Sequence, residues 1–193
     1  MSFFIVLEGL DGVGKSTLAR RYAQQYGHQL MTTPGAELLP LRTDIINGLG
    51  NSQSAKALFY AAVVQAEGEK AREFIQQGQA VIMDRYRAST IAYAHERGVT
   101  LDLTSILTQA YAPHLSILLT LNEDERQQRL HKRGTTAEDI ETLNPDFRSS
   151  VLTRLQSMCD IELDLTQASE AEAVLLLKQC IAANIVCQDI KSI

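Results

Sequence analysis

Short apolar runs alternate with amphipathic stretches along most of this chain. Residues 3–7 form an unbroken apolar run, which is typical of a strand buried on both faces of a parallel sheet. After it, Leu18, Tyr22 and Tyr26 recur at a helical spacing and predict a helix over residues 15–26. Because strand and helix patterns keep alternating, the chain is expected to have an α/β fold.

The pattern extends over one domain of ordinary size, since 193 residues with 45% hydrophobic content can bury a single core. Residues 134–139 are small and polar between two helical stretches, so we expect a mobile excursion there and not a domain linker. The tail at residues 185–193 has no clear periodicity. Strands are predicted at residues 3–7, 29–32, 80–83, 115–121 and 161–165, and helices at 15–26, 41–47, 54–77, 89–96, 102–110, 123–133, 145–158 and 169–183.

A glycine-rich run between the first predicted strand and helix fits the P-loop pattern G-x-x-x-x-G-K-[ST]. Glycines let the backbone turn tightly and aim its N–H groups at an anion. Lys15 should reach the β- and γ-phosphates, and the Ser16 hydroxyl should take one position on Mg²⁺. We therefore predict that the chain binds a nucleoside triphosphate. The predicted ATP contacts are Gly9, Leu10, Asp11, Gly12, Val13, Gly14, Lys15, Ser16 and Thr17.

A second polar site follows the third predicted strand. Asp84 and Arg85 stand directly after an apolar run and so reach the sheet edge that carries the P-loop. Asp84 suits a metal or a metal-bound water, and Arg85 suits the oxygens of a transferred phosphoryl group. A strand-end salt bridge between neighbours is the simpler alternative, but the P-loop context favours a functional role.

Three arginines share one face of the helix predicted at residues 123–133. Arg126, Arg129 and Arg133 are spaced so that all three guanidinium groups fall within a narrow arc. If the segment that follows acts as a lid, its closure would bring Arg129 and Arg133 to ATP and exclude water. A solvated, charged helix explains the same spacing.

Charge and cysteine content narrow the remaining possibilities. The formal net charge of -5, without a basic tract, argues against binding to nucleic acid or a membrane surface. Cys159, Cys180 and Cys187 are odd in number and form no C-x-x-C pair, so they are expected to be thiols in a reducing compartment. With no leader pattern or long apolar stretch in the chain, a cytoplasmic location is expected.

These motifs together resemble the thymidylate kinases, a family of P-loop nucleoside monophosphate kinases. The resemblance implies a five-stranded parallel sheet with helices on both faces, one domain over residues 1–193 and a short lid at about residues 133–144. It also implies a homodimer, ATP with Mg²⁺ as donor, and the reaction dTMP + ATP to dTDP + ADP. The matching pieces are Glu8 to Thr17, Thr33-Pro34-Gly35, Leu58-Phe59, Asp84-Arg85-Tyr86 with Ser89-Thr90 and Ala92-Tyr93, and residues 129–141.

By this resemblance the site residues take defined roles. Lys15, Asp84 and Arg85 would be catalytic, and Ser16 with Asp84 would hold the metal. The acceptor would contact Arg42, Phe59, Arg85 and Tyr93, while Arg129 and Arg133 would join the P-loop around ATP.

Several positions differ from the family pattern. Thr32 and Val63 replace arginines, Ala94 replaces a glutamine, and Asp139 replaces a lid arginine. Two alternatives therefore stay open: a related kinase acting on a nucleoside or another small acceptor, and an ATP-binding regulator with little turnover. Loss of an acceptor-side arginine is what the nucleoside-kinase alternative predicts, whereas the intact P-loop favours an enzyme.

Overall fold

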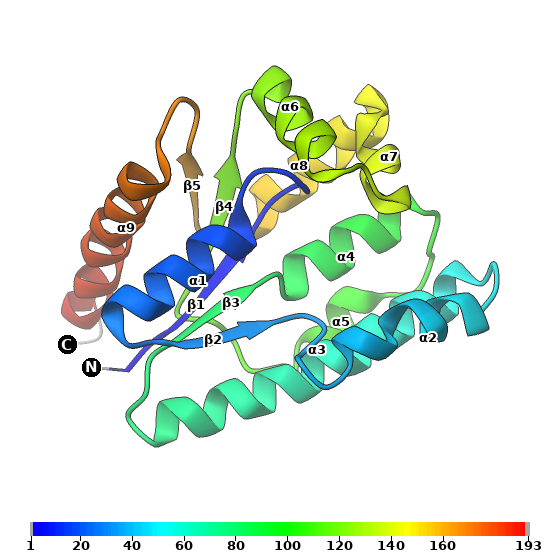
Figure 1. The fold of residues 1–193 in the computed structure, drawn as a ribbon. Coiled ribbons are helices and arrows are strands. Elements are labelled where there is room, and N and C mark those ends of the chain that lie inside the picture. Colours follow the sequence, from blue (N-terminus) through cyan, green and yellow to red (C-terminus); the bar gives the residue numbers. More distant parts are fainter. Residues whose placement is uncertain (1, 192–193) are drawn as a thin grey trace.

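One parallel sheet forms the centre of the molecule, and helices cover both of its faces (Figure 1). The computed structural model describes residues 2–191, without the side chains of residues 137–138 and 186–191. All four strand pairs are parallel, and the strand order is β2-β3-β1-β4-β5. The predicted α/β fold is confirmed. The strands are β1 (Phe4–Glu8), β2 (Gln29–Thr32), β3 (Val81–Asp84), β4 (Leu115–Thr120) and β5 (Ile161–Asp164).

Strand β1 explains how the sheet separates two cores. Its side chains point alternately to opposite faces, as the two-residue period of a strand requires. Phe4 and Val6 pack into the cluster that holds α3 and α5, while Ile5 and Leu7 pack into the cluster that holds α1, α8 and α9. All four side chains are fully or almost fully buried, which is why the sequence shows an apolar run and not an alternation.

The helices follow the predicted order. Their bounds are α1 (Lys15–Tyr26), α2 (Arg42–Gly48), α3 (Gln53–Gln76), α4 (Arg87–Glu96), α5 (Leu103–Leu107), α6 (Glu123–Arg133), α7 (Ala137–Leu143), α8 (Pro145–Met158) and α9 (Glu170–Lys191), with a 3-10 turn η1 (Leu39–Leu41) before α2.

Two expectations about the C-terminal half need correction. The second half of the polar segment expected as an excursion, residues 137–139, belongs to helix α7, whose first turn is stabilised by a capping box between Thr136 and Asp139. The last helix, α9, continues to Lys191 and so includes most of the tail that lacks a clear pattern; residues 192–193 lie outside the described part. At α7, local hydrogen bonding thus outweighs the polar composition of the segment.

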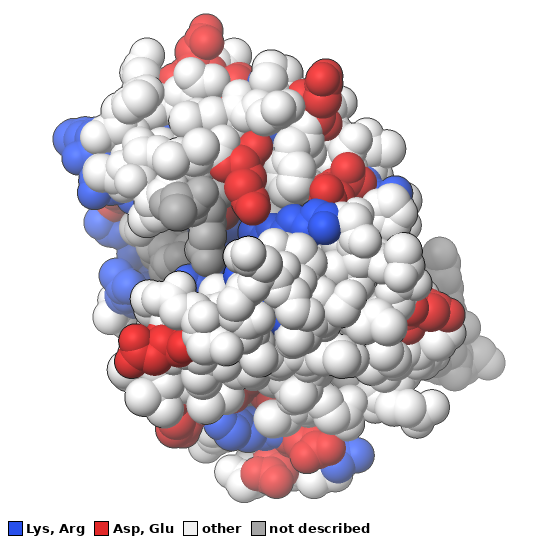
Figure 2. Space-filling view, turned by 90° about the vertical axis from the view of Figure 1, so that its right-hand side faces the viewer, with Lys and Arg blue, Asp and Glu red and all other residues white. Residues whose placement is uncertain are grey.

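The cysteines and the surface charges were also described by the sequence predictions. Cys159 and Cys180 are free, and burial raises the pKa of both; the side chain of Cys187 lies outside the described residues. Over residues 2–191, no helix is both long and apolar enough to span a bilayer. Figure 2 shows lysine and arginine side chains in the hollow that crosses this face, with acidic side chains on the surface on either side of it.

Candidate active site

The strand register brings the polar motifs to one edge of the sheet. Leu7 pairs with Asp84 on one side, and Thr32 pairs with Asp84 on the other, so the ends of β1, β2 and β3 lie side by side. The P-loop leaves this edge directly after Glu8. The parallel topology therefore places the P-loop and the Asp84-Arg85 turn next to each other, as the sequence predicts.

The P-loop backbone depends on glycine at several points. Gly9 has a φ of 142°, and a Cβ there would stand 2.6 Å from the carbonyl oxygen of Leu119. Gly14 has a φ of 101° and immediately precedes the first turn of α1. Because L-residues rarely adopt such angles, other side chains would strain the loop. The amides at the start of α1 are left unpaired within the helix and can bind an anion.

Lys15 lies beneath this loop and is almost fully buried. Its ammonium donates to the carbonyl oxygen of Leu10 over 2.8 Å. Burial, and then the positive charge of Arg85, lower the pKa of Lys15 to about 8. A buried, poorly solvated ammonium gains strongly from a phosphate placed against it.

Ser16 and Asp84 provide oxygens suited to a divalent cation. The Ser16 hydroxyl donates to Asp84 Oδ2, while Asp84 Oδ1 is buried and has no hydrogen-bond partner among the described residues. An unpaired buried carboxylate oxygen is costly unless a water or an ion completes it. Hydroxyl and carboxylate oxygens are ligands that Mg²⁺ accepts, and no set of three His, Cys, Asp or Glu residues in the described part offers a rival metal site.

A cavity of about 440 Å³ opens above the P-loop. Arg129 and Arg133 of α6 line it, so the structure brings both predicted arginines to the P-loop. Arg126 differs, because it is 1% exposed and donates to the carbonyl oxygens of Asp11 and Thr142. It therefore ties α6 to the P-loop and α7. The cavity is lined by Asp11, Gly12, Val13, Gly14, Lys15, Ser16, Thr17, Leu18, Arg21, Arg129, Arg133, Leu165, Ala168, Glu170 and Ala173.

Both lid-side arginines have carboxylate partners. Arg129 Nη2 lies 2.6 Å from Glu125 Oε1, one helical turn away, and Arg133 Nη2 lies 2.6 Å from Asp139 Oδ1. Asp139 also accepts from the backbone and the hydroxyl of Thr136. The residue that departs from the family pattern in the lid thus holds one of the two predicted ATP contacts.

Arg85 has an unusual backbone and a precisely held side chain. Its φ of 65° is left-handed, a conformation uncommon outside glycine. The guanidinium donates to Asp11 Oδ1 over 2.7 Å and to Ser89 Oγ over 2.9 Å, and it lies 5.2 Å from the ring centroid of Tyr93. Burial alone would raise the pKa of Asp11, but Arg85 and then Lys15 outweigh it and hold that pKa well below its usual value. Arg85 is therefore rigidly positioned between strand, P-loop and α4.

Glu8 is a functional-site neighbour whose role the sequence does not reveal. Its buried carboxylate accepts from the backbone N–H groups of Tyr86, Ala88 and Ser89, and from the Ser89 hydroxyl. Burial outweighs these bonds and raises the pKa of Glu8. The carboxylate thus caps the N-terminus of α4 and fixes Ser89 under Arg85. Since its partners are about eighty residues away, no local pattern could have indicated this.

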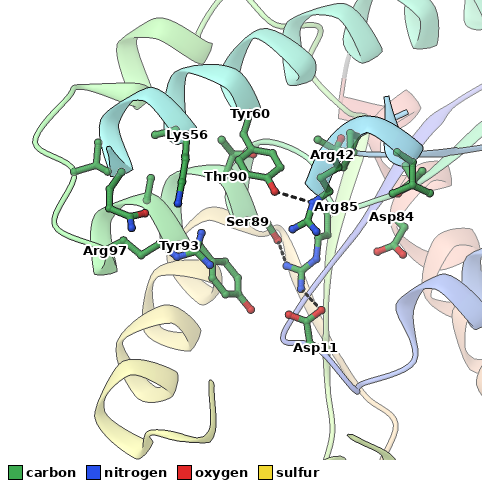
Figure 3. Close-up of a pocket in the computed structure, with 18 residues that line it drawn as sticks. Asp11, Arg42, Lys56, Tyr60, Asp84, Arg85, Ser89, Thr90, Tyr93 and Arg97 are labelled. Carbon is green, nitrogen blue, oxygen red and sulfur yellow. Dashed lines mark hydrogen bonds and ion pairs between the residues drawn. The ribbon is translucent and has the colours of Figure 1, made fainter. Parts of the chain in front are cut away.

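A second cavity, of about 230 Å³, adjoins the first (Figure 3). Asp11 lines both cavities, and Arg85 stands beside it in the second. Of the predicted acceptor residues, Arg42 and Tyr93 also line this cavity. Its lining consists of Asp11, Thr32, Thr33, Pro34, Leu39, Arg42, Gln53, Lys56, Ala57, Tyr60, Asp84, Arg85, Ser89, Thr90, Tyr93, Ala94, Arg97 and Val99.

Phe59 is not among those lining residues, and its neighbour Tyr60 is. The Tyr60 hydroxyl accepts from Arg42 Nε over 2.8 Å, so the two side chains form one wall. Phe59 lies beside Tyr60, with ring centroids 5.3 Å apart. The structure therefore offers Tyr60, and not Phe59, as the aromatic residue of α3 that faces the cavity.

The positions that differ from the family pattern do not all line the second cavity. Thr32 and Ala94 line the second cavity, so the residue types there shape it directly. Val63 is 3% exposed and does not line it. Lys56 and Arg97 also line the cavity, and neither residue was predicted from the sequence to do so. Spacing was a usable signal for Arg97, which follows the predicted Tyr93 by four residues, whereas Lys56 is four residues from Tyr60, a residue that only the packing of α3 brings to the cavity.

Two adjoining cavities that meet at Asp11, beside the fixed Arg85, suit group transfer between two ligands. The first combines backbone amides, a buried ammonium and the guanidinium groups of Arg129 and Arg133, which is an anion site for a polyphosphate. The second has Arg85 at one end, Lys56 and Arg97 at the other and apolar side chains along its walls, as a small phosphorylated molecule would require. The arrangement can align two phosphate-bearing ligands in line.

Comparisons with known proteins agree with this geometry. A model of the family described as thymidylate kinase matches residues 7–174. A probable thymidylate kinase of Pyrococcus abyssi is 35% identical over 150 residues, which is 70% of this chain and 73% of that protein. A thymidylate kinase of Syntrophotalea carbinolica is 33% identical over 149 residues, 69% of either chain. Among solved structures, the thymidylate kinase of Candida albicans has a TM-score of 0.76 at 22% identity, covering 95% of this chain and 92% of that one.

Proposed function

Since this chain belongs to the thymidylate kinase family and is a phosphotransferase, we propose that its two cavities hold the two substrates of one reaction. The P-loop cavity binds ATP, and the second cavity binds dTMP. Transfer of the γ-phosphate gives dTDP and ADP. The reaction itself is that of the family, and the assignment of residues to it is the proposal.

The observation that carries the assignment is the contact between Asp11 and Arg85. Asp11 belongs to the P-loop and lines both cavities, while Arg85 lines the acceptor cavity and is anchored to Asp11 over 2.7 Å. A phosphate of the acceptor bound at Arg85 would face the P-loop. Positioning and neutralisation of charge supply most of the rate in phosphoryl transfer, and this arrangement provides both.

Each side chain has a distinct task in this scheme. The Lys15 ammonium offsets charge on the donor phosphates, and the P-loop amides hold them in place. Arg85 orients the acceptor phosphate and offsets the charge that develops between the two substrates. Arg129 and Arg133 add charge from the lid side, once their own carboxylate partners are exchanged for phosphate oxygens. Lid closure over the donor would exclude water.

Mg²⁺ is part of the proposal, and Ser16 with Asp84 would hold it. The unpaired Asp84 Oδ1 fits a metal or a metal-bound water. When bound, the ion would offset charge on the phosphates of the donor. We also propose a homodimer working in the cytoplasm, which rests on the family resemblance and on the expectation of reduced thiols.

The alternatives can be separated from this function by one assay. ATP and Mg²⁺ are offered with dTMP, other nucleoside monophosphates and free nucleosides, and the phosphorylated product is identified together with released ADP. We expect dTMP to be turned over and nucleosides to be inert. Products from nucleosides alone would overturn the monophosphate-kinase assignment, and ADP release no faster than that of a Lys15→Ala variant would favour a regulator.

A further inference from the structure

The end of the acceptor cavity opposite Asp84 carries two cations, Lys56 and Arg97 (Figure 3). Helix α4 explains the separation: Ser89, Tyr93 and Arg97 succeed one another at four-residue steps along one face. Two such steps cover about 12 Å at 1.5 Å per residue. Ser89 contacts Arg85 at the phosphate end, so Arg97 marks the far end.

Arg97 is already engaged by the protein. Its guanidinium donates to both oxygens of Glu141, with Nη2 2.6 Å from Oε2, and it lies 5.5 Å from the centroid of the Tyr93 ring. Arg85 lies 5.2 Å from the same centroid. Tyr93 is thus flanked by two guanidinium groups. The charge of Arg97 is balanced by Glu141, and this ion pair joins the end of α4 to α7.

Lys56 has no such engagement. Within residues 2–191, no described group forms a hydrogen bond or ion pair with its ammonium. The ammonium has three N–H donors, so up to three acceptor atoms of a ligand could bind to it. Figure 3 shows the side chain extending from α3 toward the cavity. A half-buried ammonium that lines a cavity without a protein partner is available to a ligand.

The surroundings of Lys56 fit a flat ring. Ala57, Ala94 and Val99 are nearly fully buried and present only methyl groups, and the rings of Tyr60 and Tyr93 complete the walls. Gln53 lies one turn before Lys56 and can present either its amide carbonyl or its NH₂ group, so it does not discriminate between donor and acceptor groups on a ring. Lys56 can only donate. The far end therefore favours a ring edge that accepts hydrogen bonds.

We propose that Lys56 is a specificity-determining residue that donates to a carbonyl oxygen on the base of the acceptor, and so selects keto pyrimidines over bases with an amino group at that edge. The proposal rests on the proposed function, because it takes the second cavity as the acceptor site. An amino group facing an ammonium leaves both donors unpaired, which is a strong basis for rejection.

Calorimetric binding of dTMP, dUMP, dCMP and dAMP tests the proposal directly. Wild type should bind dTMP and dUMP at least tenfold more tightly than dCMP. Lys56→Met should reduce that preference to about threefold or less, while Lys56→Arg, which still only donates, should keep it. The matched control is Arg72→Met, which removes a cation from the exposed side of α3 and should leave the preference unchanged. Thermal unfolding of each variant checks that the fold is retained.

The outcomes separate this inference from the proposed function. If wild type phosphorylates dTMP and Lys56→Met keeps the full preference over dCMP, the role of Lys56 is overturned and the kinase assignment stands. If binding depends on Lys56 but no monophosphate is phosphorylated, the kinase assignment falls and the role of Lys56 stands. Binding of none of the four nucleotides by wild type would overturn both.

Discussion

Arg85 and Asp11 form an ion pair of 2.7 Å that joins the turn after β3 to the P-loop. Their side chains are 21% and 26% exposed, so both can meet a ligand without leaving each other. Because Asp11 lines both cavities, the pair marks the boundary at which a group would pass from one ligand to the other.

Arg85→Lys should reduce kcat by about a hundredfold while changing the KM for ATP by less than about threefold. Lysine keeps the charge but has no planar fork with which to contact Asp11, Ser89 and a phosphate together. Steady-state kinetics with ATP and dTMP varied separately would measure this. Arg87→Lys, two residues away and outside both cavities, is the matched control. An equal loss in both variants would contradict the assignment.

Activity should fall as pH rises above about 8 because of Lys15. Its pKa is lowered from 10.5 to about 8 by burial and by Arg85, so the free protein loses this charge above about pH 8. Bound phosphates favour the ammonium, and ATP binding above that pH therefore requires proton uptake. Titration calorimetry at pH 8.5 in buffers of different ionisation enthalpy would detect the uptake. Affinity that is constant from pH 7 to 9.5 would contradict this.

The same shift sets the sign of a stability effect. Between about pH 8 and 10.5 the unfolded chain binds the Lys15 proton and the folded chain does not. Stability contributed by this group therefore rises with pH across that window, since the cost of burying the charge is relieved. Loss of ATP affinity above pH 8 is thus not a consequence of weakening of the fold at Lys15.

Ser16→Ala should raise the Mg²⁺ concentration needed for half-maximal activity by about tenfold or more. The variant removes one oxygen ligand and leaves Asp84 without the hydroxyl that donates to it. Turnover measured against free Mg²⁺ at saturating ATP gives this concentration. Ser89 is no suitable control, since it holds Arg85, so the exposed Ser149 of α8 is replaced instead, as Ser149→Ala. An unchanged Mg²⁺ requirement would contradict the proposed ligand set.

Asp139→Asn should lower the KM for ATP by about threefold. The amide oxygen can still accept from the backbone of Thr136 and keep the capping box, but the charge that holds Arg133 is lost. The Arg133 side chain is 51% exposed and that of Asp139 is 1% exposed, and an ion pair with one solvated partner competes with phosphate by roughly that factor. In the double variant Asp139→Asn, Arg133→Ala the gain should vanish. A gain that persists without Arg133 would show that the pair does not restrain ATP binding.

The strands and the placement of the P-loop could be predicted from the sequence, because local pattern and sheet topology indicate the same arrangement. All five strands were predicted to within two residues at either end; β1, β3 and β4 are largely buried and therefore read as apolar runs, whereas β2 and β5 are partly exposed and mix apolar and polar residues. The same logic placed the P-loop beside Asp84 and Arg85. Helix α7 was missed, although the Thr136 to Asp139 spacing is a capping signal that outweighs its polar composition.

Orientation and long-range contact were beyond the sequence. Phe59 and Tyr60 are adjacent aromatic residues, and only the packing of α3 decides that Tyr60 faces the cavity. Val63 is buried outside the cavity, so its side chain is no part of the cavity wall. Glu8 caps α4 across the sheet, and such a contact between distant segments leaves no local pattern.

In the proposed reaction, a phosphoryl group passes between the two cavities at Asp11 and Arg85. It is tested most directly by incubating the protein with Mg²⁺, dTMP and ATP labelled at the γ-phosphate, and separating the products. We predict that the label appears in dTDP in equal amount to the ADP released, and that Lys15→Ala abolishes both. Label found only in inorganic phosphate, with dTMP unchanged, would contradict the account.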